Sequence, residues 1–300
     1  MAWPGASEFG GQPQVRRMLQ YHGHTSAVIA LAFSPDSTRL GSLGRDGTFI
    51  EFDPFGGIAH QSAHPQQASA MAYTTDGDWM IGRAGGIERA NLAPISAAFG
   101  PSVTVLAILD PKTLVTGWGD RLRGSSGHLV LYDLNRGQFR TPRFSEPAGV
   151  RSLAVHPASR TIAWANGSRR ISLWTITRPD QTHLNLSHSS PSIAFHPDGG
   201  SLAAALDYSI RVFDFTTRRE PRLFQGHRGP VMAVAITPDG RSLISGSWDE
   251  TVRVWDYASG EPREEVRWPT GKVRCLAVSP DGSRVAAAGQ SGSVVVWDRE

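Results

Sequence analysis

The chain has 300 residues, of which 40% are hydrophobic, 19% charged and 9% aromatic, and its formal net charge is +3. This composition is typical of a folded globular protein and excludes a long disordered chain, which would have few aromatic residues and a large charge imbalance. A single cysteine, Cys275, excludes an intrachain disulfide and any zinc or iron–sulfur site built from several cysteines. No apolar run is long enough to span a bilayer and the N-terminus does not resemble a secretion signal, so we expect a cytoplasmic protein without a membrane segment.

The first residues predict a flexible leader followed by a unit of short strands. Residues 1–13 are rich in proline and glycine and are expected to be mobile. The first unit then contains Gly23-His24, an apolar strand at 28–33, the turn residues Pro35-Asp36 and a second strand at 49–53. Short β-branched runs separated by Gly, Pro, Asp and Ser predict many short strands rather than helices.

The middle of the chain contains weaker copies of this unit. Each copy closes with an aromatic residue before a polar one, as in Tyr132-Asp133 and Phe213-Asp214, and the most divergent copy closes near Ala90. One connection, residues 117–128, is several residues longer than its equivalents and carries Trp118, Arg121, Leu122 and Arg123. Long loops on rigid scaffolds often have functional roles, but drift of one loop is an equally good explanation.

The last two copies are the most regular. One runs from Gly226-His227 through Pro238-Asp239-Gly240 to Trp255-Asp256, and the other ends at Trp297-Asp298. Across the chain the closing positions fall at residues 52, 90, 132, 174, 213, 255 and 297. Their mean spacing of about 41 residues lies within the 40–45 residues of a four-stranded propeller blade.

With its Gly-His, Pro-Asp-Gly and Trp-Asp motifs at this period, the chain resembles the WD40-repeat β-propeller family. The resemblance implies an all-β fold in which residues 14–300 form a single seven-bladed propeller of four-stranded antiparallel blades. In that family each repeat supplies the outer strand of one blade and three strands of the next. Because the last repeat ends after its third strand, residues 15–20 are expected to pair with the strand that ends at Trp297 and to close the ring. We expect a monomeric domain.

The late repeat also contains the residue types of a catalytic triad, in His227, Ser247, Asp249 and Trp255. The resemblance implies instead that these four form a buried structural hydrogen-bond tetrad. His60 and His64 have the spacing of a metal-binding pair, but no third ligand is close in sequence, so solvated loop histidines are expected. The sequence shows neither a convincing carboxylate pair nor a phosphate-binding loop. We therefore expect no enzyme activity, no cofactor and no metal.

The resemblance further implies that each blade presents a few partner-facing residues on the narrower face of the ring. Transferred to this sequence, these positions contain five basic residues and no acid, together with three apolar residues: Arg45, Arg83, Arg151, Lys272, Arg274, Trp248, Met232 and Leu206. The third unit stays unassigned because of its long loop. Trp, Met and Arg are typical interface anchors. The sequence thus predicts a non-enzymatic interaction scaffold or sensor module that binds an acidic or acidic–apolar protein segment. Nucleic-acid binding through the arginines is the alternative, and a propeller enzyme is a weaker one.

Overall fold

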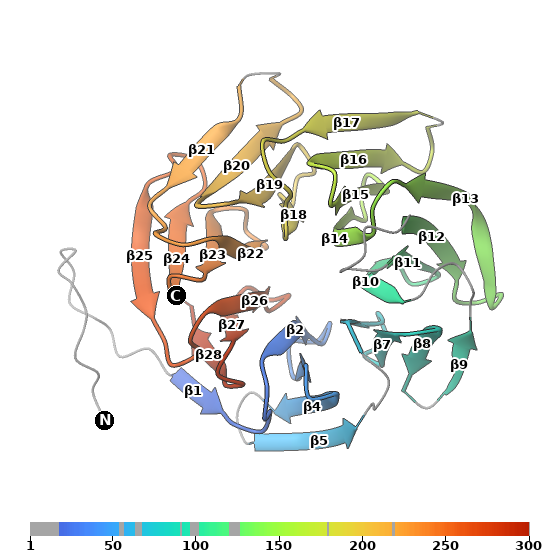
Figure 1. Cartoon of the computed structure of the whole chain (residues 1–300), viewed down its shortest axis with the longest axis horizontal. Coiled ribbons are helices and arrows are strands. Elements are labelled where there is room, and N and C mark those ends of the chain that lie inside the picture. Colours follow the sequence, from blue (N-terminus) through green and yellow to red (C-terminus); the bar gives the residue numbers. More distant parts are fainter. Residues whose placement is uncertain are drawn as a thin grey trace.

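Seven four-stranded antiparallel sheets form a ring around a central axis (Figure 1). The computed structural model describes residues 18–53, 57–63, 68–90, 92–96, 102–119, 127–178, 180–217 and 220–299, without the side chains of 141–143. Within these ranges the secondary structure is all-β, with no helix. The predicted seven-bladed propeller is therefore confirmed. The leader predicted at residues 1–13 lies outside the described residues.

The blades are numbered in chain order. Blade 1 contains β2 (Val28–Phe33), β3 (Leu40–Gly44), β4 (Thr48–Asp53) and β5 (Gly57–Ala63). Blade 2 contains β6 (Ala70–Tyr73), β7 (Trp79–Arg83), β8 (Gly86–Arg89) and β9 (Leu92–Ser96). Blade 3 contains β10 (Val103–Asp110), β11 (Thr113–Trp118), β12 (Gly127–Asp133) and β13 (Gln138–Glu146). Blade 4 contains β14 (Val150–His156), β15 (Thr161–Asn166), β16 (Arg170–Thr175) and β17 (Gln181–Asn185).

The remaining blades follow the same order from the axis outward. Blade 5 contains β18 (Ile193–Phe195), β19 (Ser201–Leu206), β20 (Ser209–Asp214) and β21 (Arg222–Gln225). Blade 6 contains β22 (Val231–Ile236), β23 (Ser242–Ser247), β24 (Thr251–Asp256) and β25 (Pro262–Arg267). Blade 7 contains β26 (Val273–Val278), β27 (Arg284–Gly289), β28 (Val294–Asp298) and, from the other end of the chain, β1 (Met18–Tyr21).

The two ends of the chain close the ring together, as the sequence predicts. Strand β1 pairs antiparallel with β28, so that Met18 lies opposite Trp297 and Tyr21 opposite Val294. The Tyr21 ring packs on Phe52 of blade 1 with centroids 4.6 Å apart, and its hydroxyl donates to the Asp53 carbonyl at 3.0 Å. The closing strand therefore completes blade 7 and also contacts blade 1.

The hydrophobic core lies between the blades. Among the described residues, each of seven buried clusters joins side chains of two neighbouring blades, and together they cover all seven blade interfaces. Small residues allow this close stacking: Ala203, Ala204 and Ala205 of β19 are all fully buried, with the first and third facing blade 6 and the second facing blade 4. A single sheet could not bury both of its faces, so stability depends on the stacked ring.

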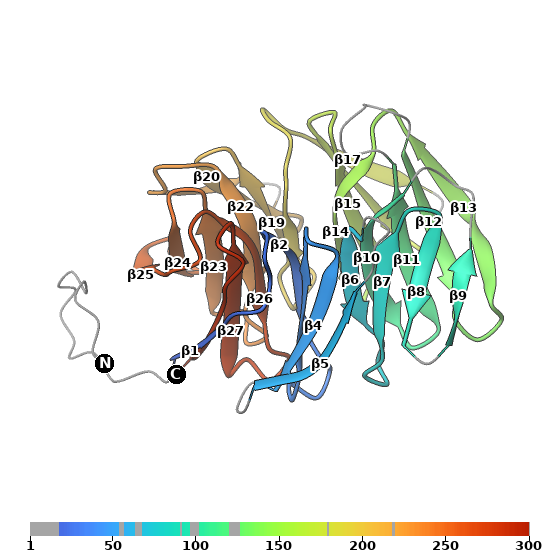
Figure 2. The ribbon, with the colours of Figure 1, turned by 60° about the horizontal axis from the view of Figure 1, so that its bottom comes forward.

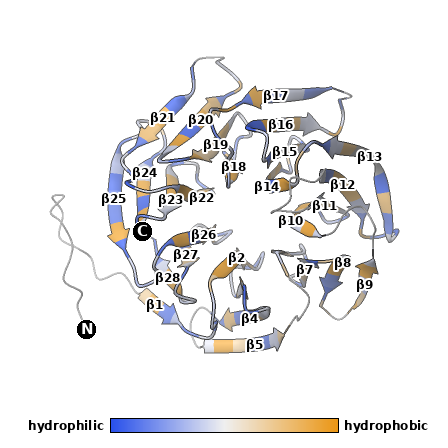
Figure 3. Ribbon diagram, viewed as in Figure 1, coloured by the Kyte–Doolittle hydropathy of each residue, from blue (hydrophilic) through white to orange (hydrophobic). Residues whose placement is uncertain are grey.

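The outer strands of the ring are more polar than its inner ones. Strand β25, of sequence PREEVR, is mostly exposed and largely hydrophilic (Figure 3). Such charges discourage edge-to-edge pairing with other molecules. In the tilted view, the strands of each blade run between the two faces of the ring, so that the two ends of a strand lie on opposite faces (Figure 2).

Candidate functional site

A cavity of about 510 Å³ lies at the centre of the ring, where the seven inner strands meet. Each blade contributes one side chain from an equivalent place near the start of its first strand: Ile29, Ser69, Thr104, Arg151, Pro191, Met232 and Arg274. Five of these residues lie where the pairing of the first and second strands shifts by one residue. A bulge of this kind re-aims a side chain. In these five blades the repeated irregularity therefore directs one residue toward the axis.

The cations of blades 7 and 1 gather on one side of this cavity. Arg274 and Arg45 both line it, and Arg45 is exposed. Lys272 Nζ lies 5.4 Å and Arg274 Cζ 5.7 Å from the centre of the Trp248 ring, which is within range of cation–π attraction. Burial lowers the pKa of Arg274, and the positive charge of Arg45 lowers it further. The two guanidinium groups thus repel each other across the boundary between the blades.

Acidic side chains do not compensate this charge. Within the described ranges, no carboxylate lies within ion-pair distance of Arg45, Lys272 or Arg274, and no acid lines the cavity. The Nε atom of Arg274 and the indole Nε1 of Trp248 are buried and have no hydrogen-bond acceptor in the described part of the chain. Arg170 Nε and Arg253 Nε share this status, so Trp248 Nε1 is the donor that distinguishes this face, because buried donors in native proteins are nearly always bonded.

We call the face of the ring at which β22 and β26 begin and β23 ends the mouth face. Most of the predicted partner positions lie on this face. Arg45, Arg151, Met232 and Arg274 line the cavity, and Lys272 and Trp248 adjoin them. Thr104 is the equivalent in the third unit, which the sequence left unassigned. Its place before the Leu-Ala pair shared with β2, β14 and β26 was the signal that could have identified it.

Two predicted positions differ. Arg83 does not line the cavity, and its Nε lies 3.6 Å from Glu88 Oε2. The prediction that Leu206 offers an apolar contact is wrong, because Leu206 is only 2% exposed and packs between blades 4 and 5. The turn that follows it is one residue shorter than in blade 6: Leu206 pairs with Ser209, and Asp207 adopts a φ of 46°. The shorter turn keeps Leu206 inside the strand.

The triad-like residues of blade 6 form a buried hydrogen-bond chain, with one correction. Trp255 Nε1 donates to Ser245 Oγ at 2.8 Å, Ser245 Oγ lies 2.7 Å from His227 Nε2, and His227 Nδ1 lies 2.8 Å from Asp249 Oδ2. The serine is thus Ser245 and not the predicted Ser247. Trp255 pairs with Leu243, and its indole reaches diagonally to Ser245, two residues further along β23. Ser247 lies four residues beyond Leu243, about 13 Å away, and is too distant for the indole.

Ser247 has a separate role. Its hydroxyl donates to the Gly229 carbonyl at 2.8 Å and accepts from the Asp249 backbone N–H at 3.1 Å. Both serines are fully buried. A hydroxyl in this position cannot reach a substrate, so the Ser-His-Asp set is structural. Hydrogen bonds from His227, Thr251 and the Arg228 backbone lower the pKa of Asp249 despite the opposing effect of its burial.

Other blades keep parts of this chain. In blade 1, His24 Nε2 lies 2.7 Å from Ser42 Oγ, so the serine is present there too, and Phe52 replaces the tryptophan. Blade 4 uses a carboxylate that the sequence analysis did not identify. Glu146, 3% exposed, accepts from Trp164 Nε1 at 2.7 Å and from Asn166 Nδ2 at 2.5 Å. Arg170 Nη2 lies 3.3 Å from the same carboxylate.

Three further sequence predictions concern single residues. Trp118 was placed in the long connection but belongs to β11, where it is fully buried and donates to Thr116 Oγ1 at 2.8 Å. Arg121, Leu122 and Arg123 of that connection lie outside the described residues, as does His64. His60 is exposed as expected but lies in β5 and not in a loop. No group of residues suited to a metal ion occurs in the described ranges.

Cys275 lies beside the mouth cluster, the name used here for Arg45, Trp248, Lys272 and Arg274, and is not a reactive thiol. Its sulfur is 3.9 Å from the Val28 carbonyl of blade 1. Burial raises the pKa of the thiol to about 12. It is therefore protonated at neutral pH and a poor nucleophile.

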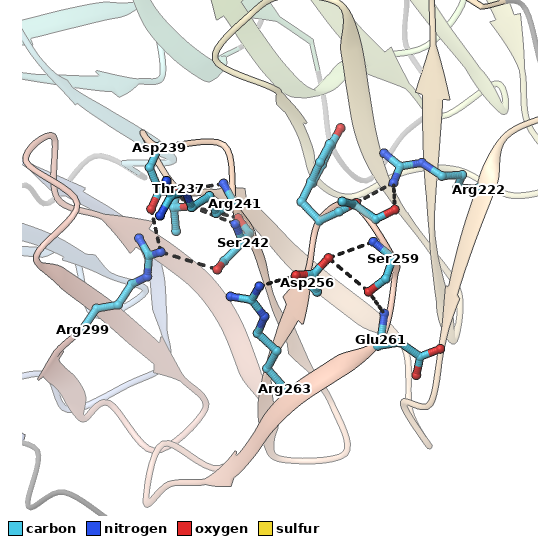
Figure 4. A network of polar contacts seen from close by, with 12 residues as sticks. Arg222, Thr237, Asp239, Arg241, Ser242, Asp256, Ser259, Glu261, Arg263 and Arg299 are labelled. Atoms are coloured by element: carbon cyan, nitrogen blue, oxygen red, sulfur yellow. Dashed lines mark hydrogen bonds and ion pairs between the residues drawn. The ribbon is translucent and has the colours of Figure 1, made fainter. Parts of the chain in front are cut away.

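The face opposite the mouth provides a contrast in charge. There Arg299 Nη2 donates to Asp239 Oδ2 at 3.0 Å and Arg263 forms an ion pair with Asp256 (Figure 4). Asp239 also receives hydrogen bonds from Thr237 and the Arg241 backbone. Turn carboxylates thus neutralise arginines on this face, whereas the described residues of the mouth face offer no such partner to Arg45, Lys272 or Arg274.

Comparison with models of known protein families shows which family the chain belongs to. A model described as "WD domain, G-beta repeat" matches residues 15–53, 181–214, 218–256 and 260–298, which amount to half of the chain. The chain belongs to the WD40 family. It is 23% identical over 305 aligned positions to the guanine nucleotide-binding protein subunit beta of Lymnaea stagnalis, covering 80% of this chain and 86% of that protein.

Two larger relatives match over shorter shares of their length. Human WD repeat-containing protein 36 is 35% identical over 130 residues, which cover 42% of this chain and 14% of the relative. Mouse striatin-4 is 26% identical over 238 residues, covering 76% of this chain and 27% of the relative. The chain therefore spans only a minor part of either protein. No helix in the described ranges is long and apolar enough to cross a membrane.

Proposed function

We propose that this WD40 propeller is a non-enzymatic, cytoplasmic interaction scaffold or sensor module that binds an acidic–apolar protein segment at its mouth face. One observation carries the proposal: Lys272 and Arg274 lie against the partly buried Trp248, and Arg274 and Arg45 line the adjoining cavity, which no acid among the described residues lines. Relatives that are WD repeat proteins, among them a G-protein β subunit, support the assignment to a protein-binding class.

The lining of the cavity suits a segment of mixed character. Pro191, Met232 and Ile29 provide apolar surface around the axis. The arginines stand beside and across from this surface, because Arg151 belongs to blade 4 and Arg274 to blade 7. A segment with a large apolar side chain flanked by acidic residues would contact both the apolar surface and the arginines. Trp and Arg at the centre of an interface typically supply most of the binding energy.

The test measures binding of short acidic–apolar peptides to the intact protein by fluorescence anisotropy. Trp248→Ala should weaken binding about 30-fold, because a central aromatic anchor is worth roughly 2 kcal/mol or more. Arg274→Glu should mainly slow association and flatten its salt dependence. The matched control is Arg241→Glu, at the other end of β23 and so on the opposite face.

Other outcomes would move or replace the proposal. If substitutions at Trp248 and Arg274 leave the affinity for the peptide unchanged, whereas substitutions at Arg121 and Arg123 abolish binding, the binding site lies in the long connection. If generic DNA or RNA binds more tightly than the peptides, with steep salt dependence and loss in the Arg274 variant, the protein binds nucleic acid.

A further inference from the structure

The mouth cluster also indicates which kind of acidic group it receives. Elsewhere among the described residues, several arginines at blade boundaries have carboxylate partners, such as Glu51 for Arg39 and Asp239 for Arg299. Arg45 and Arg274, from neighbouring blades, line the same cavity with no carboxylate partner in the described ranges. Like charges close together repel each other unless a counter-charge arrives.

We propose that Arg45 and Arg274, with Lys272 and Trp248, form a binding site for a phosphate monoester dianion. The shared chemistry is a tetrahedral oxyanion, carried by a phosphorylated side chain of the bound segment or by a free phosphorylated small molecule. This inference rests on the proposed function of the same face and specifies its ligand.

Charge is the first reason to prefer a phosphate over a carboxylate. Arg45, Lys272 and Arg274 bring three positive charges, and no carboxylate in the described ranges lies within ion-pair distance of them. A carboxylate would balance one of them, whereas a phosphate monoester carries a charge of about −1.5 to −2 at neutral pH. The dianion therefore leaves the smallest residual charge in the site.

Donor geometry is the second reason. Arg274 Nε and Trp248 Nε1 are buried N–H groups without acceptors among the described residues, and the Arg45 guanidinium adds exposed donors. Guanidinium groups bind phosphate oxygens in pairs, and a phosphate offers three oxygens in different directions. A carboxylate offers two oxygens in one plane, so it matches donors that arrive from several directions less well than a tetrahedral phosphate does.

The mutual repulsion of the two arginines supports the same conclusion. Arg274 is half-buried, and both its burial and the charge of Arg45 disfavour its protonated form. A bound dianion would offset the repulsion between the two guanidinium groups, and this relief would contribute to the free energy of binding.

The experiment compares phenyl phosphate with benzoate, which carries the same ring on a carboxylate, by calorimetry at constant ionic strength. We expect phenyl phosphate to bind at least tenfold more tightly. The double variant Arg45→Gln/Arg274→Gln should lose at least tenfold in phenyl phosphate affinity, and Trp248→Phe, which keeps a ring but removes the indole N–H, should lose severalfold. Arg241→Gln on the opposite face is the matched control and should bind as the unchanged protein does.

Two results would overturn the inference: equal affinities for phenyl phosphate and benzoate, or phosphate binding that survives the double variant while circular dichroism shows an intact fold. Inorganic phosphate and a pair of peptides, one with phosphoserine and one with glutamate at the same place, separate the sources. Tighter binding of the phosphopeptide assigns the group to a protein segment, and equal binding of inorganic phosphate assigns it to a small molecule. Peptide binding that depends on Trp248 but not on phosphate would refute the anion site while leaving the proposed scaffold function intact.

Discussion

Replacing Ser245 with alanine tests the buried hydrogen-bond chain, and blade 1 contains a natural comparison. Ser245 and Ser42 are both fully buried on the second strand of their blades, and each hydroxyl lies 2.7 Å from a histidine Nε2. Ser245 also accepts from the Trp255 indole, whereas Phe52 stands in the equivalent place in blade 1 and offers no N–H. The two substitutions therefore differ by one orphaned donor.

The expected magnitudes follow from that difference. In blade 6 the histidine Nδ1 faces a carboxylate and so carries the proton, which makes Nε2 the acceptor of the Ser245 hydroxyl. Ser245→Ala leaves both this nitrogen and the Trp255 N–H unsatisfied, at about 1–3 kcal/mol each, or about 2–6 kcal/mol in all. Ser42→Ala removes the partner of the His24 nitrogen and a longer hydrogen bond to the Ile50 carbonyl at 3.3 Å but orphans no N–H donor, and it should cost about 1–3 kcal/mol.

Urea denaturation followed by circular dichroism measures both losses, and a cycle with Trp255→Phe isolates the indole. In the Trp255→Phe background, Ser245→Ala should cost no more than Ser42→Ala does in the unchanged protein. If Ser245→Ala and Ser42→Ala cost the same in the unchanged protein, the indole hydrogen bond contributes nothing and the reasoning fails.

Three further predictions concern other parts of the ring. Deleting residues 1–13 should leave the unfolding midpoint nearly unchanged, whereas deletion through Gln20 removes most of β1 and should cost about 3 kcal/mol or more; equal midpoints would refute closure by this strand. Glu146→Gln should lower the free energy of unfolding by about 1–3 kcal/mol, because an amide cannot accept from both Trp164 and Asn166, and a neutral effect in urea denaturation would contradict this. Burial lowers the pKa of His24 against the opposing effect of Asp46, so the unfolded chain takes up a proton first and the free energy of unfolding should fall as the pH drops below about 6.5. His24→Gln should flatten this dependence of the denaturation midpoint on pH between pH 7.5 and 5.5. An unchanged dependence would exclude His24 as its cause.

The sequence by itself determined the architecture. Strand signals at a period of about 41 residues predict a propeller, and the missing outer strand after Trp297 predicts closure by the N-terminal segment, which pairs as expected. These features are local or periodic: alternation, turn residues and repeat length follow from the order of side chains along a strand. The approximate set of mouth residues comes from the resemblance to the WD40 family, whose partner-facing positions were transferred repeat by repeat.

Only the tertiary structure decided which side chains meet. Ser245 and Ser247 have the same strand parity, so alternation cannot distinguish them, and the diagonal reach of Trp255 across the sheet selects Ser245. Leu206 is withdrawn into the core because one residue fewer in its turn extends the strand. Arg45 and Arg274 come from opposite ends of the chain, and only the packing of blade 7 against blade 1 brings them to the same cavity. Such contacts depend on register, bulges and ring closure, which arise only when the blades pack together.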